Sequence, residues 1–208
     1  MTRRFVVSGT DTNVGKTVFS AGLTGALNGH YWKPIQSGFA PEGDKETVMR
    51  LSGLPASQIL PERYRLTAPL SPHRSAELDG IVIQPATLTV PDVAGPLVIE
   101  GAGGLMVPIT REFLQIDLYR KWDLPVILVA RTTLGTINHT LLSIAALRMQ
   151  EIPILGVAFV GEDHSDSIRT IGEMGEVRVL GRLPHLPQLN AHTLRDAFTM
   201  HFREEDFA

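Results

Sequence analysis

The 208-residue sequence predicts an α/β fold with a doubly wound, mainly parallel sheet and helices on both faces. Three observations lead to this prediction. Several short segments are apolar without alternation, helical patterns separate them, and a glycine-rich turn follows the first apolar segment. Strands that are apolar on both faces are typical of parallel sheets covered by helices on each side.

The expected strands are short runs of Val, Ile, Leu, Phe and Ala. In chain order they are Phe5–Val7, Leu97–Ile99, Val126–Ala130, Ile154–Val160 and a weaker one at Val177–Leu180. A further short strand is expected to carry Lys33.

Helical patterns lie between these strands. Thr17–Leu27 is rich in Ala, Leu and Val, and apolar residues recur at helical spacing in Asn138–Gln150. The other expected helices are Asp44–Leu51, Ser165–Met174 and Asn190–Phe202. The alternation of strands and helices favours a doubly wound α/β arrangement.

The stretch from Gly38 to Gly95 differs from the rest, because it holds seven of the 14 prolines. We expect an irregular excursion with short helices there. No internal repeat and no dividing linker is recognisable, so residues 1–208 are expected to form a single domain.

Composition narrows the function classes. The net charge of −3 offers no general attraction for nucleic acid or for an acidic membrane. The absence of cysteine excludes disulfides, thiolate metal sites and a cysteine nucleophile. No apolar run approaches the roughly 20 residues that span a bilayer, and no targeting segment is recognisable. These features predict a cytoplasmic protein.

The stretch "SGTDTNVGKT" between the first strand and the first helix predicts a phosphate-binding loop. In such a P-loop, backbone N–H groups surround phosphate oxygens, a lysine reaches the outer phosphates, and a hydroxyl binds Mg²⁺. Gly15, Lys16 and Thr17 match these positions, although Gly9 lies one residue farther away than the strict pattern requires. The alternative, an ordinary glycine-rich turn, leaves the Lys-Thr pair unexplained. The fold class is therefore P-loop NTPase-like.

Glu100 opens the stretch "EGAGG" directly after an expected strand. Ligands of parallel sheets lie at the carboxyl ends of the strands, and P-loop proteins hold Mg²⁺ there with an acidic residue. A solvent-facing glutamate is the alternative, but the neighbouring P-loop favours the metal site.

The stretch "YWKPIQSG" supplies an ammonium group from Lys33 and a hydroxyl from Ser37, which could enter the same cleft. A lysine there would stabilise a transferring phosphoryl group, although a lone lysine is more often a surface residue. Asp44 opens an expected helix, and its simplest reading is an acid near the helix N-terminus.

The stretch "RTTLGTINHT" follows the strongest apolar run and opens the longest clear helix. The N–H groups of Gly135–Asn138 could bind a carboxylate at this helix start. The alternative, favoured by these residues alone, is a helix capped by the side chain of Thr136 or Asn138. The seven histidines show no ligand spacing, so no structural metal is expected.

Taken together, these motifs resemble the dethiobiotin synthetase family. "GTDTNVGKT", "WKPIQSG", "EGAGG" and "LGTINHTLL" occur in this order and with these separations in the family, and the resemblance covers nearly the whole chain. It implies synthesis of dethiobiotin from 7,8-diaminopelargonic acid, CO₂ and ATP with Mg²⁺, in biotin biosynthesis. The implied route passes through a carbamate and a carbamic-phosphoric anhydride.

The resemblance also implies roles for individual residues. The catalytic residues would be Lys33, Lys16 and Thr12. The nucleotide would contact Asn13, Val14, Gly15, Lys16, Thr17, Val18, Glu100, Leu183 and Pro184. The substrate would contact Ser37, Gly135, Thr136, Ile137 and Asn138, and Mg²⁺ would be bound by Thr17, Asp44 and Glu100. In the family the substrate's carboxylate is received by the other subunit, so a homodimer with active sites at its interface is implied.

One departure from the family concerns the nucleotide base. Family members often read the adenine edge with an Asn after the fourth long apolar strand, where this chain has Val160 and Gly161. We therefore expect a relaxed choice among nucleoside triphosphates.

Three other functions compete with this interpretation. A ParA/MinD-type ATPase switch would carry a second lysine early in the loop, where this chain has Asp11. An amidoligase of the cobyrinic acid type would need a glutaminase domain with a catalytic cysteine. A binding module without chemistry would not explain why Lys16, Lys33 and Glu100 are expected at one cleft.

Overall fold

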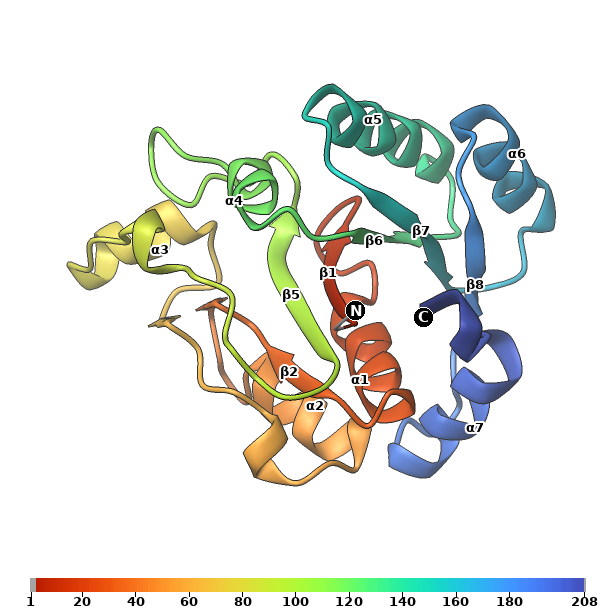
Figure 1. Cartoon of the computed structure of the whole chain (residues 1–208), viewed down its shortest axis with the longest axis horizontal. Coiled ribbons are helices and arrows are strands. Elements are labelled where there is room, and N and C mark those ends of the chain that lie inside the picture. The colour runs from red at the N-terminus through yellow and green to blue at the C-terminus, as the bar shows by residue number, and fades with distance from the viewer. Residues whose placement is uncertain (1–2, 208) are drawn as a thin grey trace.

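The computed structural model describes residues 3–207 and contains a six-stranded sheet between two layers of helices (Figure 1). All strand pairs of this sheet are parallel. The spatial order is β2-β5-β1-β6-β7-β8. The strands span Arg4–Gly9 (β1), His30–Trp32 (β2), Leu97–Gly104 (β5), Val126–Arg131 (β6), Ile154–Val160 (β7) and Val179–Leu183 (β8).

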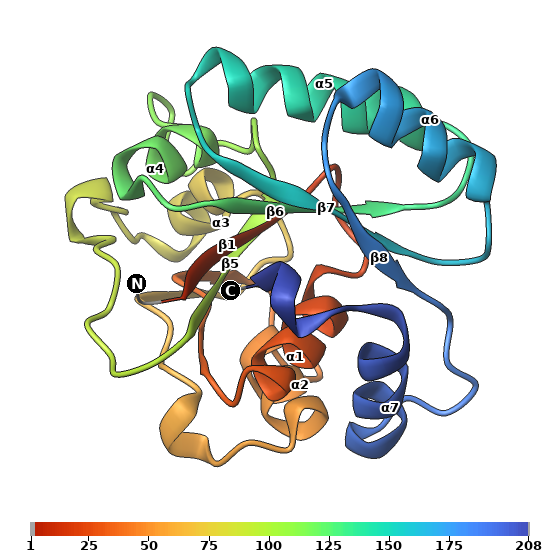
Figure 2. The same cartoon turned by 45° about the vertical axis from the view of Figure 1, so that its right-hand side comes forward.

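Helices cover both faces of the sheet, as Figure 2 shows. One face is covered by α1 (Lys16–Ala26), α2 (Asp44–Ser52) and α7 (Ala191–His201). The other face is covered by α4 (Gln115–Trp122), α5 (Thr136–Met149) and α6 (Ser165–Gly175). The predicted doubly wound parallel fold is therefore confirmed.

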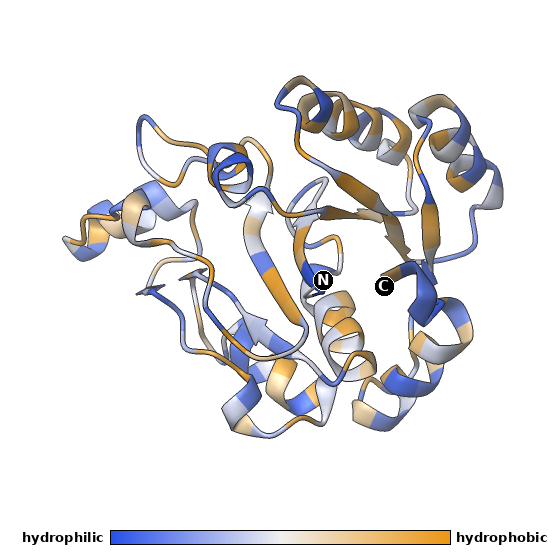
Figure 3. Cartoon of the chain, viewed as in Figure 1, coloured by the Kyte–Doolittle hydropathy of each residue, from blue (hydrophilic) through white to orange (hydrophobic). Residues whose placement is uncertain are grey.

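The strand β6 shows why the apolar runs do not alternate. Ile127 and Val129 pack into the cluster that contains Phe19 of α1, whereas Leu128 points to the opposite face and packs near Ile144 of α5. Because successive side chains point to opposite faces, a strand with helices on both sides needs apolar residues at every position. Figure 3 shows this apolar character along β6 and β7.

The irregular excursion between β2 and β5 is also confirmed. It holds a separate two-stranded parallel sheet made of β3 (Ile35–Ser37) and β4 (Tyr64–Leu66). It also contains α2, the short helix α3 (Pro72–Asp79) and the 3₁₀ turns Ala56–Gln58 and Pro85–Thr87. A last 3₁₀ turn, Glu204–Phe207, packs Phe207 against Phe5 of β1.

Several element boundaries differ from the prediction by a few residues. The strand expected at Val177–Leu180 begins at Val179, because the N–H of Val177 still bonds to Gly172 O at the end of α6. The strand expected to carry Lys33 ends at Trp32. Glu100 lies inside β5 rather than after it, because pairing with β1 continues past it.

The chain reverses its direction across the sheet around β1. From β1 it crosses to β2 at one edge, and after β5 it continues through β6, β7 and β8 toward the other edge. Doubly wound sheets bind ligands at such a switch point, beyond the carboxyl ends of the strands. The loop after β1 lies at this position. Across residues 3–207, no helix has the length and apolarity needed to cross a membrane.

Candidate active site

The loop between β1 and α1 presents backbone donors at the switch point. No hydrogen bond among residues 3–207 uses the N–H groups of Asn13, Val14 or Gly15. The first N–H groups of α1 are also free of intrahelical partners, as at every helix start. The side chain of Val14 is buried in the core, so this residue can serve a ligand only through its backbone. The loop can therefore surround an anion with N–H groups.

Gly15 is the residue on which this loop shape depends. Its φ of 95° lies in the left-handed region, which favours glycine. A Cβ atom at Gly15 would also lie 2.8 Å from a methyl group of Val160, at the end of β7. Any larger residue would therefore have to displace the loop or the strand.

Lys16 is buried at the base of the loop, and its ammonium group donates a hydrogen bond to Asp11 O at 3.0 Å. Burial is the main reason why the pKa of Lys16 is lowered from 10.5 to about 8. The carboxylate of Glu100 opposes this shift, and the nearby ammonium of Lys33 adds to it. Near neutral pH Lys16 is thus a charged donor with little water around it, suited to phosphate.

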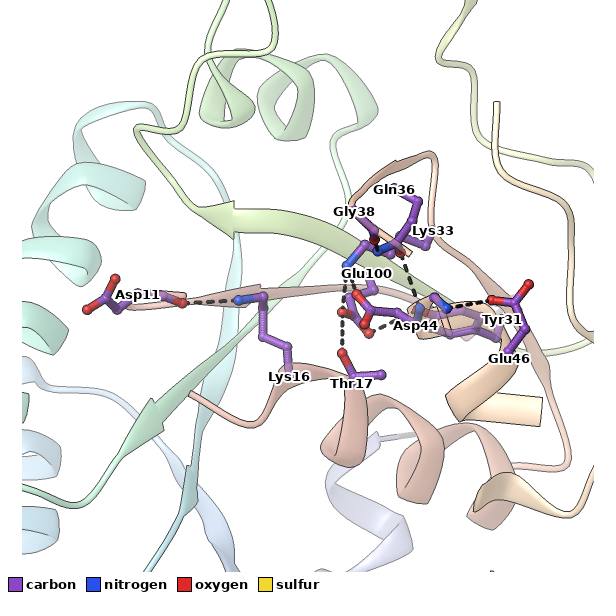
Figure 4. A network of polar contacts seen from close by, with 11 residues as sticks. Asp11, Lys16, Thr17, Tyr31, Lys33, Gln36, Gly38, Asp44, Glu46 and Glu100 are labelled. Atoms are coloured by element: carbon purple, nitrogen blue, oxygen red, sulfur yellow. Dashed lines mark hydrogen bonds and ion pairs between the residues drawn. The ribbon is translucent and has the colours of Figure 1, made fainter. Parts of the chain in front are cut away.

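Lys33 lies between two carboxylates, as Figure 4 shows. Its ammonium donates to Glu100 Oε1 at 3.0 Å and also to Asp44 Oδ2. Glu100 is fully buried and Lys33 is 6% exposed. Burial works against the charge of Lys33, but Glu100 and then Asp44 outweigh it and raise the pKa of Lys33 above its ordinary value.

Strand register brings these groups together. Trp32 of β2 pairs with Ile99 of β5, so the next residues along the two strands, Lys33 and Glu100, lie side by side. Asp44 approaches from α2, of which it is the first residue. The sequence interpretation of Asp44 as an acid at a helix start is confirmed, and it does not conflict with contact to Lys33.

Thr17 completes an oxygen-rich group on the same side. Its hydroxyl donates to Glu100 Oε1 at 2.9 Å. Among residues 3–207, no cluster of three or more His, Cys, Asp and Glu could hold a metal by itself. Mg²⁺ commonly takes only one or two carboxylates and completes its shell with phosphates and water. The hydroxyl of Thr17 and the carboxylates of Glu100 and Asp44 therefore fit a Mg²⁺ ion that arrives with a nucleotide.

Two buried residues of this network were not predicted from sequence. The Tyr31 hydroxyl donates to Glu100 Oε2 at 3.0 Å. Gln36 donates to Gly38 O at 2.6 Å and accepts from the Asp44 N–H at 3.3 Å. The spacing offers a signal for Tyr31, because residues two apart in an extended chain point to the same side, and Lys33 follows two positions later.

These groups line one cleft of about 880 Å³. Its walls come from the loop, from the segment after β2, from the start of α2, from β5 and from the start of α3. The cleft brings together the predicted residues Thr12, Asn13, Gly15, Lys16, Thr17, Val18, Lys33, Ser37, Asp44 and Glu100. The Ser37 hydroxyl is buried and has no partner among the described residues, which leaves it free for a ligand.

The predicted segment Gly135–Asn138 does not line this cleft. The structure also corrects the alternative of a side-chain cap. Gly135 is the N-cap, with φ 96° and no side-chain hydrogen bond, while the Thr136 hydroxyl donates to Arg131 O at 2.5 Å. Thr136 is buried, and its hydroxyl bonds to the segment before the helix. Because no side chain bonds to the helix start, neither Thr136 nor Asn138 caps it. Leu134, just before the helix, is fully exposed.

Leu183 and Pro184 lie at the end of β8 and also outside the cleft. Leu183 pairs with Val160, which contacts Gly15, so the ends of β7 and β8 flank the loop. The side chain of Leu183 is buried in the core. Arg182, which the sequence interpretation did not single out, donates to Gly161 O at 2.9 Å in the same region.

Comparison with known proteins identifies the family. A family model described as an AAA domain matches residues 3–193. The ATP-dependent dethiobiotin synthetase BioD of Rhodopseudomonas palustris strain BisB5 is 58% identical over 207 residues, which cover 100% of this chain and 98% of that protein. The chain belongs to the dethiobiotin synthetase family. The synthetase of Novosphingobium aromaticivorans is 60% identical over 204 residues, which cover 98% of each protein.

Solved structures show the same fold at much lower identity. A ParA family ATPase from Chlorobium tepidum has a TM-score of 0.52 and 13% identity, with 95% of this chain and 98% of that chain covered. The MinC:MinD cell division complex of Aquifex aeolicus has a TM-score of 0.51 and 16% identity, with 93% of this chain and 86% of that chain covered. At such identities the likeness concerns the P-loop fold alone, whereas the synthetase relatives match along the whole chain.

Proposed function

We propose that this cleft carries out the ATP-dependent ring closure that gives dethiobiotin in biotin biosynthesis. The chain is a dethiobiotin synthetase by family, which makes it a ligase that forms C–N bonds with ATP as co-substrate. The observation that carries the proposal is the position of Lys33, which lies between Glu100 and Asp44 in the cleft of the phosphate-binding loop. One site thus offers cationic groups to phosphates and to a second anionic reactant.

The proposed substrates are 7,8-diaminopelargonic acid and CO₂. One amine adds to CO₂ and loses a proton, which gives a carbamate. A carbamate oxygen attacks the γ-phosphorus of ATP, and ADP leaves. The second amine then attacks the carbonyl carbon of the mixed anhydride, inorganic phosphate leaves, and the ring closes. The protein mainly has to position the reactants and stabilise their negative charge.

Each role in this proposal matches a group in the cleft. Lys16 and the loop N–H groups bind the β- and γ-phosphates, and Thr12 contacts their reacting end. Lys33 holds the carbamate and the transferring phosphoryl group. The free hydroxyl of Ser37 binds the diamine. Bound by Thr17, Glu100 and Asp44, Mg²⁺ would neutralise charge on the phosphate oxygens.

We further propose a homodimer that completes the substrate site. The outward face of α5 exposes two large apolar side chains, with Leu142 62% exposed and Met149 82% exposed. Leu134, which lies just before α5, is fully exposed. A helix that exposes large apolar side chains opposite its buried face is expected to pack on both faces. A second copy at this face would bring its Gly135–Asn138 to the substrate's carboxylate.

The base is proposed to lie near Leu183 and Pro184, where the ends of β7 and β8 flank the loop. Val160 offers no polar group to the adenine edge, which supports a relaxed choice of nucleotide. We further infer that residues 1–208 act as one domain and that the reaction takes place in the cytoplasm, where ATP is supplied.

The decisive experiment measures product. The protein is incubated with 7,8-diaminopelargonic acid, bicarbonate, Mg²⁺ and ATP, and dethiobiotin is detected by mass spectrometry together with released phosphate. We expect both products in equal amounts, and neither when the diamine is omitted. Phosphate release that does not depend on the diamine would contradict the proposal and favour an ATPase switch.

A further inference from the structure

Tyr31 has no role in the proposed chemistry. It directly contacts Glu100, the proposed metal ligand. Tyr31 is fully buried, as is Glu100. Its hydroxyl donates to Glu100 Oε2 at 3.0 Å, which is the only contact between Oε2 and a protein donor among the hydrogen bonds of residues 3–207. The other carboxylate oxygen, Oε1, accepts from both Thr17 and Lys33.

The three donors to Glu100, Thr17, Tyr31 and Lys33, have different roles in the proposed reaction. In the proposed function the Thr17 hydroxyl turns to Mg²⁺ and the Lys33 ammonium turns to the carbamate. Tyr31 has no such second task, because its side chain is closed off from the solvent. Its hydrogen bond to Oε2 can therefore persist while both contacts to Oε1 are exchanged.

A fully buried carboxylate needs such a permanent donor. Without hydrogen bonds a buried charge is strongly destabilised and tends to rotate or take up a proton. Groups that form hydrogen bonds to a metal ligand fix the orientation of that ligand. Their loss typically weakens metal binding by about 10- to 100-fold.

We propose that Tyr31 is a positioning residue that fixes the carboxylate of Glu100, so that Oε1 stays directed at the metal bound with the nucleotide. This inference rests on the proposed metal role of Glu100. Tyr31 itself touches neither metal nor substrate and acts through Glu100.

The structure offers a matched control in Tyr119. It is also fully buried, and its hydroxyl donates to Ser8 Oγ at 3.3 Å rather than to Glu100. Tyr31→Phe and Tyr119→Phe therefore remove the same atom from equally buried rings, and only the first removes a donor to the metal-site acid.

The test measures metal binding without turnover. Mn²⁺ is titrated into the protein with ADP, and free Mn²⁺ is followed by its electron paramagnetic resonance signal. For Tyr31→Phe we expect the dissociation constant of Mn²⁺ to rise about tenfold, and for Tyr119→Phe to change less than about twofold. In turnover with Mg²⁺, Tyr31→Phe is expected to raise the Mg²⁺ concentration for half-maximal rate while kcat largely recovers at saturation.

A second pair of variants separates positioning from simple stabilisation. In a Glu100→Gln background, Tyr31→Phe should no longer change Mn²⁺ binding, because the carboxylate on which Tyr31 acts is gone. This pair also serves if Tyr31→Phe alone does not fold, since the double variant leaves no buried charge without a donor.

The outcomes distinguish the inference from the function on which it rests. Wild-type protein that makes dethiobiotin and binds Mn²⁺ with ADP, with Tyr31→Phe binding within twofold of it, would overturn the role of Tyr31 alone. An equal loss in Tyr119→Phe, or an unchanged effect in the Glu100→Gln background, would also overturn it. Wild-type protein that binds no Mn²⁺ with ADP would refute the metal site and the inference together.

Discussion

The two ends of the proposed site are built in opposite ways. At the phosphate end, Lys33 and Glu100 are buried and joined by hydrogen bonds. At the start of α5, Leu134 is fully exposed and Gly135 has open space where a side chain would be. The first region is complete within one chain, whereas the second presents apolar surface to the outside.

This difference has a physical reason. Charged groups that stabilise a transferring phosphoryl group act best where water is excluded, and exclusion requires that the chain itself enclose them. In the proposed dimer, the contacts to the substrate's tail come instead from another chain, whose docking would bury the exposed apolar side chains of α5. Variants at the two ends should therefore fail in different ways.

Loss of charge at the phosphate end is expected to have the largest effect. Lys16→Ala removes the ammonium group at the loop and should lower kcat/KM for ATP by about a hundredfold or more, since such stabilisation is worth several kcal/mol. Rates of dethiobiotin formation provide the measurement. Lys45→Ala is the control, because Lys45 pairs with Glu62 outside the cleft and should stay near the wild-type rate. Turnover of Lys16→Ala within tenfold of wild type would refute the loop assignment.

A charge on the outer face of α5 tests the other end. Leu142→Asp would bury two carboxylates in a symmetric dimer, one from each copy, and should shift the protein to monomers and reduce activity by about tenfold or more. Light scattering and turnover at low protein concentration measure both effects. Met200→Asp places the same charge on the exposed side of α7 and should remain dimeric. A wild-type monomer with normal turnover would contradict the shared site.

The pKa of Lys16 predicts a weaker, graded effect at the phosphate end. Because burial lowers this pKa to about 8, the nucleotide-free protein loses the ammonium charge above pH 8, and phosphate binding must then restore the proton. ADP affinity should be constant just below pH 8 and fall by up to about tenfold per pH unit above it. Titration calorimetry between pH 7 and 9.5 measures this. Lys16→Arg, which stays charged, should show no such break.

The smallest effect is expected for the choice among nucleotide bases. We expect turnover with CTP and GTP within about tenfold of that with ATP, because one hydrogen bond to the base is worth only about 1 kcal/mol and Val160 makes none. A hundredfold preference for ATP would contradict this expectation. Val160→Asn should increase the preference for ATP by up to about tenfold, and Val179→Asn, at the far end of β8, should leave it unchanged.

Much of the site could be anticipated from local sequence. A glycine-rich loop between a buried strand and a helix is typical of phosphate binding. Gly15, Lys16 and Thr17 could therefore be predicted as parts of such a loop from their spacing. The resemblance to the synthetase family suggested that Lys33, Asp44 and Glu100 lie together, and the structure places these side chains in contact. Their individual roles stay predictions. Tyr31 was missed, because a tyrosine in an expected strand is most simply a core residue.

The sequence by itself determined the sheet and its helices, because apolar runs and helical periodicity follow from which faces must be buried. It also determined the phosphate-binding loop, which is local. Only the tertiary structure decided that Lys33 lies between Glu100 and Asp44, that Tyr31 holds the far oxygen of Glu100, and that Gly135–Asn138 stays outside the cleft of its own chain. These facts depend on strand register and on the placement of α2 and α5. Strand register and helix placement result from contacts between residues that are far apart in the chain, so no local sequence pattern predicts them.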